Sequence, residues 1–104
     1  MGLTVLWTEP AWEEFAERLD YLGAMNPDAA RRLRRRVDGS LRRLLEFPEI
    51  GRWVPEFGPG FYREILVKPL RLMYEIQGGT LAVTHVHRQE EALFPDSFEV
   101  EDEG

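Results

Sequence analysis

Two segments in the first half of the chain carry apolar residues at three- and four-residue spacing, the spacing of one face of a helix. The first segment follows the helix-start signal Thr8-Glu9-Pro10, and its apolar face holds Trp12, Phe15, Ala16, Leu19 and Leu22. The second follows Asn26-Pro27-Asp28 and ends before Pro48, and its apolar face holds Ala30, Leu33, Val37, Leu41 and Leu44. Because few residues separate the two segments, we expect an antiparallel helical hairpin.

Apolar runs of a β type flank this hairpin on both sides. Leu3–Trp7 predicts a first strand, and Phe61–Val67, Leu70–Gln77 and Thr80–His87 predict three more. The glycines and prolines of residues 49–60 predict a loop before them. The expected order is β-α-α-β-β-β, an α+β fold in which the helical hairpin packs on a mainly antiparallel four-stranded sheet.

Gly78-Gly79 predicts a two-residue hairpin turn between the last two strands. If Gln77 pairs with Thr80, the side chains that share a sheet face follow from the register. The face that receives the helices should hold Leu70, Leu72, Tyr74, Ile76, Leu81 and Val83, and His85 and His87 should lie on that same side unless a bulge shifts the register. The opposite, open face is expected to carry Arg63, Arg71 and Arg88.

The charge of the chain is divided unevenly along its 104 residues. The net charge is −6, but residues 90–104 contain seven acidic residues and no basic one, so residues 1–89 hold 13 basic against 12 acidic side chains. Residues 1–94 are expected to form one domain and residues 95–104 a flexible acidic tail. A sharper hypothesis is that this tail folds back over the face of Arg71 and Arg88 and weakens target binding.

Composition excludes several classes of protein. The chain has no cysteine, which rules out disulfides, a thiol nucleophile and thiolate metal sites. It also lacks both a run of about 18 apolar residues and a signal peptide, which predicts a soluble, cytoplasmic protein. His85 and His87 have a spacing that suits a metal, but no third ligand accompanies them, so we expect no metal. A core of this size leaves little room for a cofactor, and none is expected.

Several short segments together resemble the RelE/ParE toxins of type II toxin-antitoxin systems. The similarity covers about residues 3–90, in the order NPDAARRL (26–33), PEIGR (48–52), VPE (54–56), YRE (62–64), LRLMYEI (70–76) and HVHRQ (85–89). The resemblance implies neutralisation by a cognate antitoxin that binds across the helices and the sheet. It also implies one of two activities: binding of DNA gyrase, as in ParE-like members, or ribosome-dependent cleavage of messenger RNA, as in RelE-like members.

The departures from the family favour the ParE-like activity. Phe94 stands where RelE-like nucleases often have a tyrosine, and Lys68 is the only lysine. If the protein is a nuclease, the resemblance makes Arg71, Arg88 and His87 the catalytic candidates. For target binding the candidates are Arg52, Trp53, Arg63, Lys68, Arg71 and Arg88. A third interpretation is an inactive descendant that only binds its antitoxin.

Each candidate also has an ordinary structural interpretation. Arg71, in an apolar strand, can form an ion pair with Glu64 or Glu75. The seven arginines of residues 31–43 are expected to form a solvated helix face that pairs with Glu13, Glu14 and Glu17. Trp12 is expected in the core, whereas Trp53 suits the edge of the core and an exposed binding rim equally well.

Overall fold

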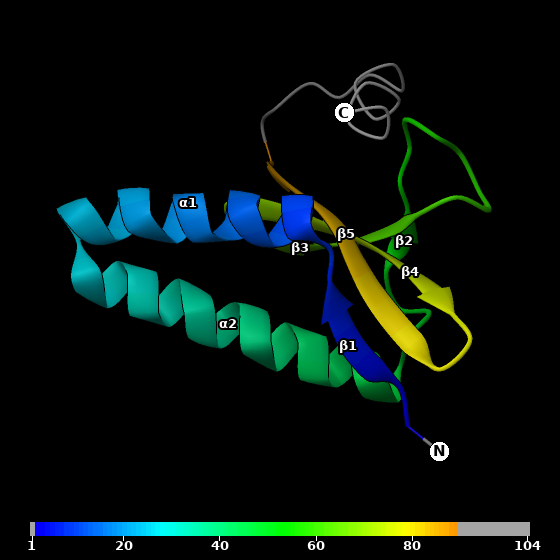
Figure 1. The fold of residues 1–104 in the computed structure, drawn as a ribbon. Helices are drawn as coiled ribbons and strands as arrows, with labels where there is room; N and C mark the ends of the chain where they lie inside the picture. The colour runs from blue at the N-terminus through cyan, green and yellow to red at the C-terminus, as the bar shows by residue number, and fades with distance from the viewer. Residues whose placement is uncertain (1, 90–104) are drawn as a thin grey trace.

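The computed structural model describes residues 2–89 and confirms the α+β fold (Figure 1). Its elements are β1 (Thr4–Trp7), α1 (Glu9–Met25), α2 (Pro27–Glu46), β2 (Arg52–Trp53), β3 (Arg63–Val67), β4 (Leu70–Gln77) and β5 (Thr80–Arg88). They match the expected order except for β2, whose two residues are too few to show a pattern within a loop. The acidic segment 95–104 and Phe94 lie outside the described residues.

The strands form a single mixed sheet in the order β1-β5-β4-β3-β2. The edge strand β1 runs parallel to β5, and each of the other neighbouring pairs is antiparallel. The β4–β5 hairpin turns at Gly78, whose φ of 57° suits a residue without a side chain, and Gln77 pairs with Thr80 as expected. The sheet is therefore mostly antiparallel, as the strand pattern indicated.

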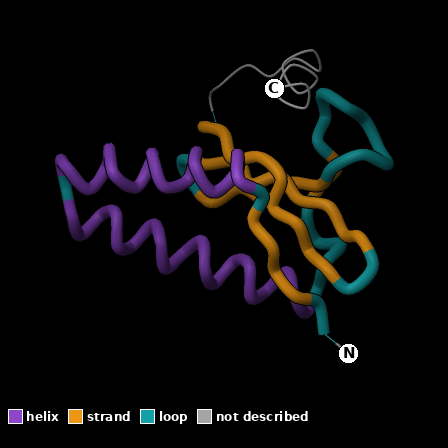
Figure 2. The backbone as a smooth tube through the Cα atoms, viewed as in Figure 1, coloured by secondary structure: helices purple, strands orange, loops and turns teal. Residues whose placement is uncertain are grey.

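Side-chain caps fix the starts of the two helices. The Thr8 hydroxyl accepts a hydrogen bond from the amide of Ala11, and the Asn26 carboxamide oxygen accepts one from the amide of Ala29. Asn26 ends α1 and begins α2, so the hairpin turns within one residue. The expected antiparallel hairpin is confirmed, and it covers one face of the sheet (Figure 2).

The main core lies between this hairpin and the sheet. It contains Phe15, Leu33, Val37, Leu41 and Leu44 from the helices and Leu70, Leu72, Tyr74, Leu81 and Val83 from the sheet. The face predicted from the Gly78-Gly79 turn is thus confirmed for these strand residues. Trp12 differs from its expected place in the core: its side chain is 42% exposed and packs edge-on against Trp7, with the Arg34 guanidinium over its ring.

A register shift in the β4–β5 ladder corrects the predicted faces beyond Tyr74. Tyr74 still pairs with Val83, but Met73 pairs with His85, so Thr84 is the extra residue of a β-bulge. Its carbonyl accepts a hydrogen bond from the Thr8 hydroxyl at 3.1 Å, which ties the bulge to the start of α1. The expected placement of His85 and His87 on the helix side is therefore wrong, because the bulge moves both to the opposite face.

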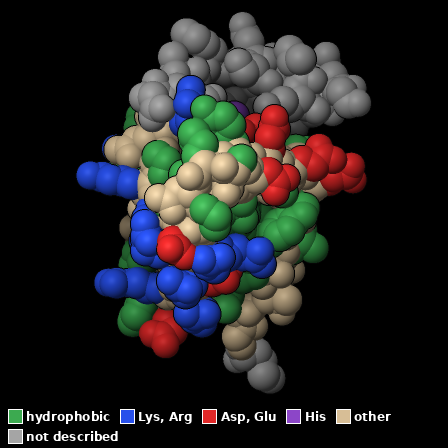
Figure 3. Space-filling view, turned by 90° about the vertical axis from the view of Figure 1, so that its left-hand side faces the viewer, with side chains coloured by type: hydrophobic (Ala, Val, Ile, Leu, Met, Phe, Trp, Pro, Cys, Tyr) green, Lys and Arg blue, Asp and Glu red, His purple; other side chains and the backbone are tan. Residues whose placement is uncertain are grey.

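The arginines of α2 form the solvated face that the sequence predicted, but the acidic residues that pair with Arg31 and Arg34 are not the expected ones. Arg31 pairs with Asp28 and Arg34 with Asp38, both within α2, rather than with the acidic residues of α1. In Figure 3 the basic side chains gather over the lower part of the molecule, which is the side of α2. The two helices thus present surfaces of different charge.

The segment between α2 and β2 is held by the hydroxyl of Tyr74. This hydroxyl donates to the Pro48 carbonyl at 2.7 Å and accepts from the Gly51 amide at 3.1 Å. A Cβ at residue 51 would lie 2.4 Å from the Tyr74 oxygen and 2.8 Å from the Glu64 carbonyl oxygen. Only glycine fits at this position without displacing its neighbours. Burial raises the pKa of Tyr74, which keeps the hydroxyl protonated as a donor.

We predict that Gly51→Ala destabilises the protein by about 1–3 kcal/mol, because the new methyl group overlaps Tyr74 and a backbone carbonyl. Gly39→Ala is the matched control, since a Cβ there meets nothing closer than 3.9 Å and α2 gains about 0.5–1 kcal/mol of helix propensity. Urea unfolding measures both changes. Equal effects of the two substitutions would contradict the close approach at Gly51.

Candidate target-binding surface

Arg71 lies at the centre of a chain of charges on the sheet face opposite the helices. Its side chain is only 6% exposed, and its Nε donates to Glu64 Oε1 at 2.7 Å. Its Nη1 and Nη2 donate to the two oxygens of Glu56 at 3.1 and 2.9 Å. The guanidinium is therefore held by two carboxylates, one of them in a bidentate geometry. The ion pair expected with Glu64 is confirmed, whereas Glu75 instead accepts a hydrogen bond from Gln77.

Glu64 extends this chain of charges to β2. Its side chain is fully buried, and its second oxygen, Oε2, accepts a hydrogen bond from Arg52 Nε at 2.6 Å. Hydrogen bonding by Arg71 holds the pKa of Glu56 below its usual value, and the same bond raises the pKa of Arg71. Four charged groups, ordered Arg52, Glu64, Arg71 and Glu56, thus connect β2, β3, β4 and the β2–β3 loop.

The β2–β3 loop covers part of the face that the sequence predicted to be open. Val54 and Met73 are fully buried there, and Phe57 and Tyr62 pack against them. The Val54 amide also donates a hydrogen bond to the Tyr62 carbonyl, which closes the loop at its base. This second apolar cluster excludes water from the neighbouring charges, so the ion pairs of Arg71 lie in a medium where they are stronger than at the surface.

The two histidines that the bulge moves to this face lie beside the loop. Their rings are stacked with centroids 6.1 Å apart, and His85 meets the Tyr62 ring edge-on at 5.4 Å. His87 is the register partner of Arg71. Arg88, expected on this face, pairs instead with Leu70, which points to the helix side, because the same bulge moves it across the sheet.

Arg63, which is half-buried, and the exposed Trp53 form a pair at the β2–β3 edge. The Arg63 guanidinium carbon lies 4.0 Å from the Trp53 ring centroid, and Nη1 donates to the Gly51 carbonyl at 2.9 Å. Trp53 is 39% exposed and the nearby Phe61 is 61% exposed. The expectation that Arg63 shares the face of Arg71 is wrong, since Arg63 pairs with Tyr74, on the helix-facing side of β4. Trp53 belongs to an exposed rim and not to the core.

The predicted binding residues therefore separate into three places. Arg52, Trp53 and Arg63 lie together at the β2–β3 edge, while Lys68 and Arg88 lie at the opposite end, beside the β3–β4 turn. Arg71 is buried between these groups. Glu56 and the loop cluster were missed by sequence reasoning, because a single acid in a Gly/Pro loop carries no pattern. The one sequence feature that pointed to this part of the sheet was the YRE segment (62–64), in which Glu64 follows Arg63.

Within residues 2–89, no group of three or more His, Cys, Asp or Glu side chains is placed to hold a metal ion. None of the helices in this part of the chain is long and apolar enough to cross a membrane.

We predict that Glu64→Gln costs about 3–5 kcal/mol of stability, because it leaves the buried Arg71 with one partner fewer. Glu56→Gln should cost less, about 1–3 kcal/mol, because Glu56 is 25% exposed and Glu64 remains in place. Chemical unfolding at pH 7 measures both losses. A larger loss for Glu56→Gln would contradict the placement of Glu64 as the buried partner.

The contribution of Glu56 should also depend on pH. Its pKa is lowered from 4.5 in the folded state, so its stabilisation is complete above about pH 4.5 and is lost as the pH falls through the lowered pKa. The stability gap between the native chain and Glu56→Gln should stay constant near neutrality and shrink in acid. A gap that persists unchanged to strongly acidic pH would show that Glu56 acts without its charge.

Comparison with known proteins agrees with this fold. The family model described as "ParE toxin of type II toxin-antitoxin system, parDE" matches residues 5–93. Among solved structures, a chain of the "Chromosomal ParDE TA system from P. aeruginosa" aligns with a TM-score of 0.69 at 18% identity, over 85% of this chain and 97% of that one. No curated protein sequence matches. The family resemblance is confirmed on its ParE side: the chain belongs to the ParE toxins of type II toxin-antitoxin systems.

Proposed function

We propose that this ParE-family toxin inhibits growth by binding DNA gyrase. The observation that carries the choice of target is the state of Arg71, the cation that a RelE-like ribonuclease would need at the reacting phosphate. Its guanidinium already donates to Glu64 and Glu56, so phosphate binding requires that these bonds break. A protein that binds its target without chemistry has no such requirement.

The target-binding surface in this proposal is centred on the Trp53–Arg63 pair, with Arg52 and Phe61 beside it. Tryptophan and arginine are the side chains most enriched among residues that dominate binding energy at protein interfaces. The contact with Trp53 and the bonds to backbone carbonyls hold Arg63 in place before binding, so little side-chain entropy is lost when a partner arrives.

The other residues predicted for target binding have different roles in this proposal. Arg71 is a positioning residue that holds Glu56 and, through it, the β2–β3 loop next to Trp53. Lys68 and Arg88 are exposed at the far end of the sheet, where their charges attract an acidic partner over a longer range. A cognate ParD antitoxin neutralises the toxin in this proposal by binding across helices and sheet.

Messenger RNA cleavage is the second candidate, and one observation favours it. The bulge at Thr84 places His87 on the face of Arg71, as its direct register partner. A histidine beside an arginine provides a proton-transfer group next to a cation, the combination that cleavage of a phosphodiester by its 2′-hydroxyl requires. This candidate also needs Arg71 to exchange a carboxylate for the phosphate.

Purified gyrase provides the test of the proposed target. The native chain should inhibit DNA supercoiling, and Trp53→Leu and Arg63→Gln should each raise the concentration for half inhibition by about tenfold, equivalent to about 1.4 kcal/mol. Arg35→Gln, at an exposed position on α2, is the matched control and should leave this concentration unchanged. Thermal unfolding of each variant checks that the fold is retained.

A parallel assay with translating ribosomes separates the two candidates. Supercoiling that continues at saturating toxin, together with cleavage of ribosome-bound messenger RNA that His87→Gln abolishes, would overturn the gyrase proposal in favour of the nuclease. Failure of both assays would leave the inactive antitoxin-binding module as the function.

A further inference from the structure

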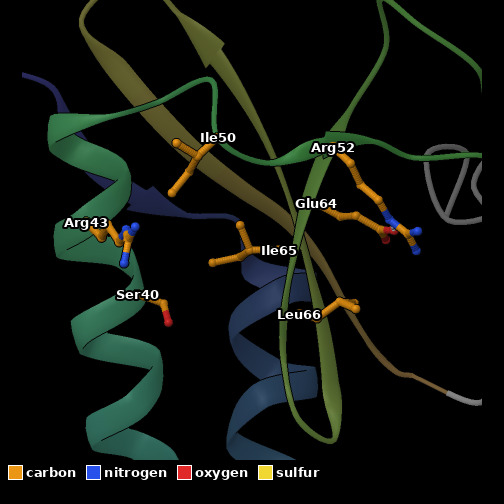
Figure 4. Close-up of a pocket in the computed structure, with 7 residues that line it drawn as sticks. All are labelled: Ser40, Arg43, Ile50, Arg52, Glu64, Ile65 and Leu66. Atoms are coloured by element: carbon orange, nitrogen blue, oxygen red, sulfur yellow. Dashed lines mark hydrogen bonds and ion pairs between the residues drawn. The ribbon is translucent and has the colours of Figure 1, made fainter.

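A groove runs between α2 and the outer edge of β3. Ser40 and Arg43 line it on the α2 side, and Figure 4 shows Ile65 directed into the space between helix and strand. Arg36 and Lys68 extend the lining toward the β3–β4 turn. The groove therefore has positively charged side chains along its length.

The β3 edge that borders the groove is uncovered beyond Glu64 in the described part of the chain. β2 pairs with Arg63 and Glu64 and ends there. Among the described strands, β4 alone pairs with Ile65–Val67, and it does so from the inner side. The backbone amides that face away from β4 are therefore open to a ligand, and such groups are donors for anionic oxygens.

The positive charge of the groove is not neutralised by residues 2–89. In that part of the chain Arg36, Arg43 and Lys68 are exposed and form no ion pair. Arg36 donates instead to the Lys68 carbonyl, which holds its guanidinium at the end of β3. Among the described residues that line the groove, Glu64 is the only acid, and both of its oxygens are already bound by arginines. This excess of positive charge favours an anionic ligand.

Helical spacing sets the cations of α2 in a row. Arg32, Arg36 and Arg43 recur on one flank of the helix, with Ser40 between the last two. At about 1.5 Å per residue, the row from Arg32 to Arg43 is about 16 Å long. One strand of duplex DNA carries a charge about every 3.4 Å along the axis, so several successive phosphates can meet this row. A single phosphate or carboxylate reaches only one of the arginines, so the row suits a polyanion.

The types of side chain indicate contact with a phosphate backbone and not with bases. The cations on the α2 wall are arginines, whose planar guanidinium suits phosphate oxygens. None of the described residues that line the groove is aromatic, whereas proteins that bind single strands stack bases on aromatic rings. The groove therefore suits a duplex. The choice of DNA rests on the proposed function, because duplex DNA is the substrate of supercoiling.

We propose that the α2–β3 groove binds the backbone of duplex DNA without sequence preference, through Arg36, Arg43 and Lys68. The Ser40 hydroxyl and the outward amides of β3 supply neutral donors beside these cations. This surface is separate from the contacts proposed for gyrase. The toxin can thus hold the protein and the DNA of one complex through two different surfaces.

Binding of the full chain to DNA in the absence of gyrase tests the proposal. Fluorescence anisotropy of a short labelled duplex measures the affinity at a series of salt concentrations. Each cation that meets a phosphate adds about 0.9 to the steepness of the fall in log affinity with log salt. Arg36→Gln/Arg43→Gln/Lys68→Gln should therefore reduce this slope by about 2.7 and weaken binding at low salt by at least about tenfold.

The other flank of α2 provides a matched control. Arg31→Gln/Arg34→Gln/Arg42→Gln removes the same charge from the side on which Arg31 and Arg34 pair with Asp28 and Asp38. This variant should keep the native slope. Thermal unfolding of each variant checks that the fold is retained.

A second variant separates charge from structure. Arg36→Lys/Arg43→Lys keeps the positive charges of the groove and should keep the native slope, because the salt dependence follows the number of phosphates neutralised. Loss of slope in this variant would contradict a backbone contact through charge.

Several results would overturn the proposal. Absence of DNA binding at low salt would do so, and so would equal losses of slope in the two triple variants, which would show that only net charge matters. Tighter binding of a single strand, of duplex RNA or of polyglutamate would overturn the choice of ligand. DNA binding without inhibition of supercoiling would remove the gyrase proposal alone, and inhibition without DNA binding would remove this proposal alone.

Discussion

The buried guanidinium of Arg71 is the constraint on which the candidate surface depends. A charge taken out of water is tolerated only when it is paired, and breaking a buried pair typically costs about 3–5 kcal/mol. Glu64 and Glu56 provide that pairing, and Glu64 also binds Arg52. Because these four groups come from three strands and one loop, the pairing fixes the β2–β3 loop over the sheet. The pair of Trp53 and Arg63 stands at the base of this loop, so its position follows from the charges buried behind it.

The fold was largely predictable because its signals are local. The caps at Thr8 and Asn26, the spacing of apolar residues in both helices and the Gly78-Gly79 turn each act over a few residues. The register prediction held from the turn to Tyr74 and failed at Thr84. The bulge at Thr84 is hydrogen-bonded to Thr8, 76 residues away in the chain, and no local pattern reveals such a contact.

The candidate site was less predictable, because burial decides what each charged residue does. For Arg71 the residues alone favoured an ion pair with Glu64 or Glu75 and the family resemblance favoured a functional cation, and the structure places its guanidinium in the ion pair with Glu64. Glu56 joins the ion pairs of Arg71 only because the β2–β3 loop folds back over the sheet, which the sequence does not indicate. The sequence left two positions open for Trp53, the edge of the core and an exposed rim, and its exposed side chain shows that it belongs to the rim.

The proposal that this ParE-family toxin acts by contact and not by cleavage rests on its central arginine, which is bound by two carboxylates. The most direct measurement is pulse labelling of DNA and protein synthesis in bacteria after induced expression without antitoxin. The account predicts that DNA synthesis falls first, and that Arg63→Gln delays this fall. An early fall in protein synthesis, abolished by His87→Gln, would contradict it.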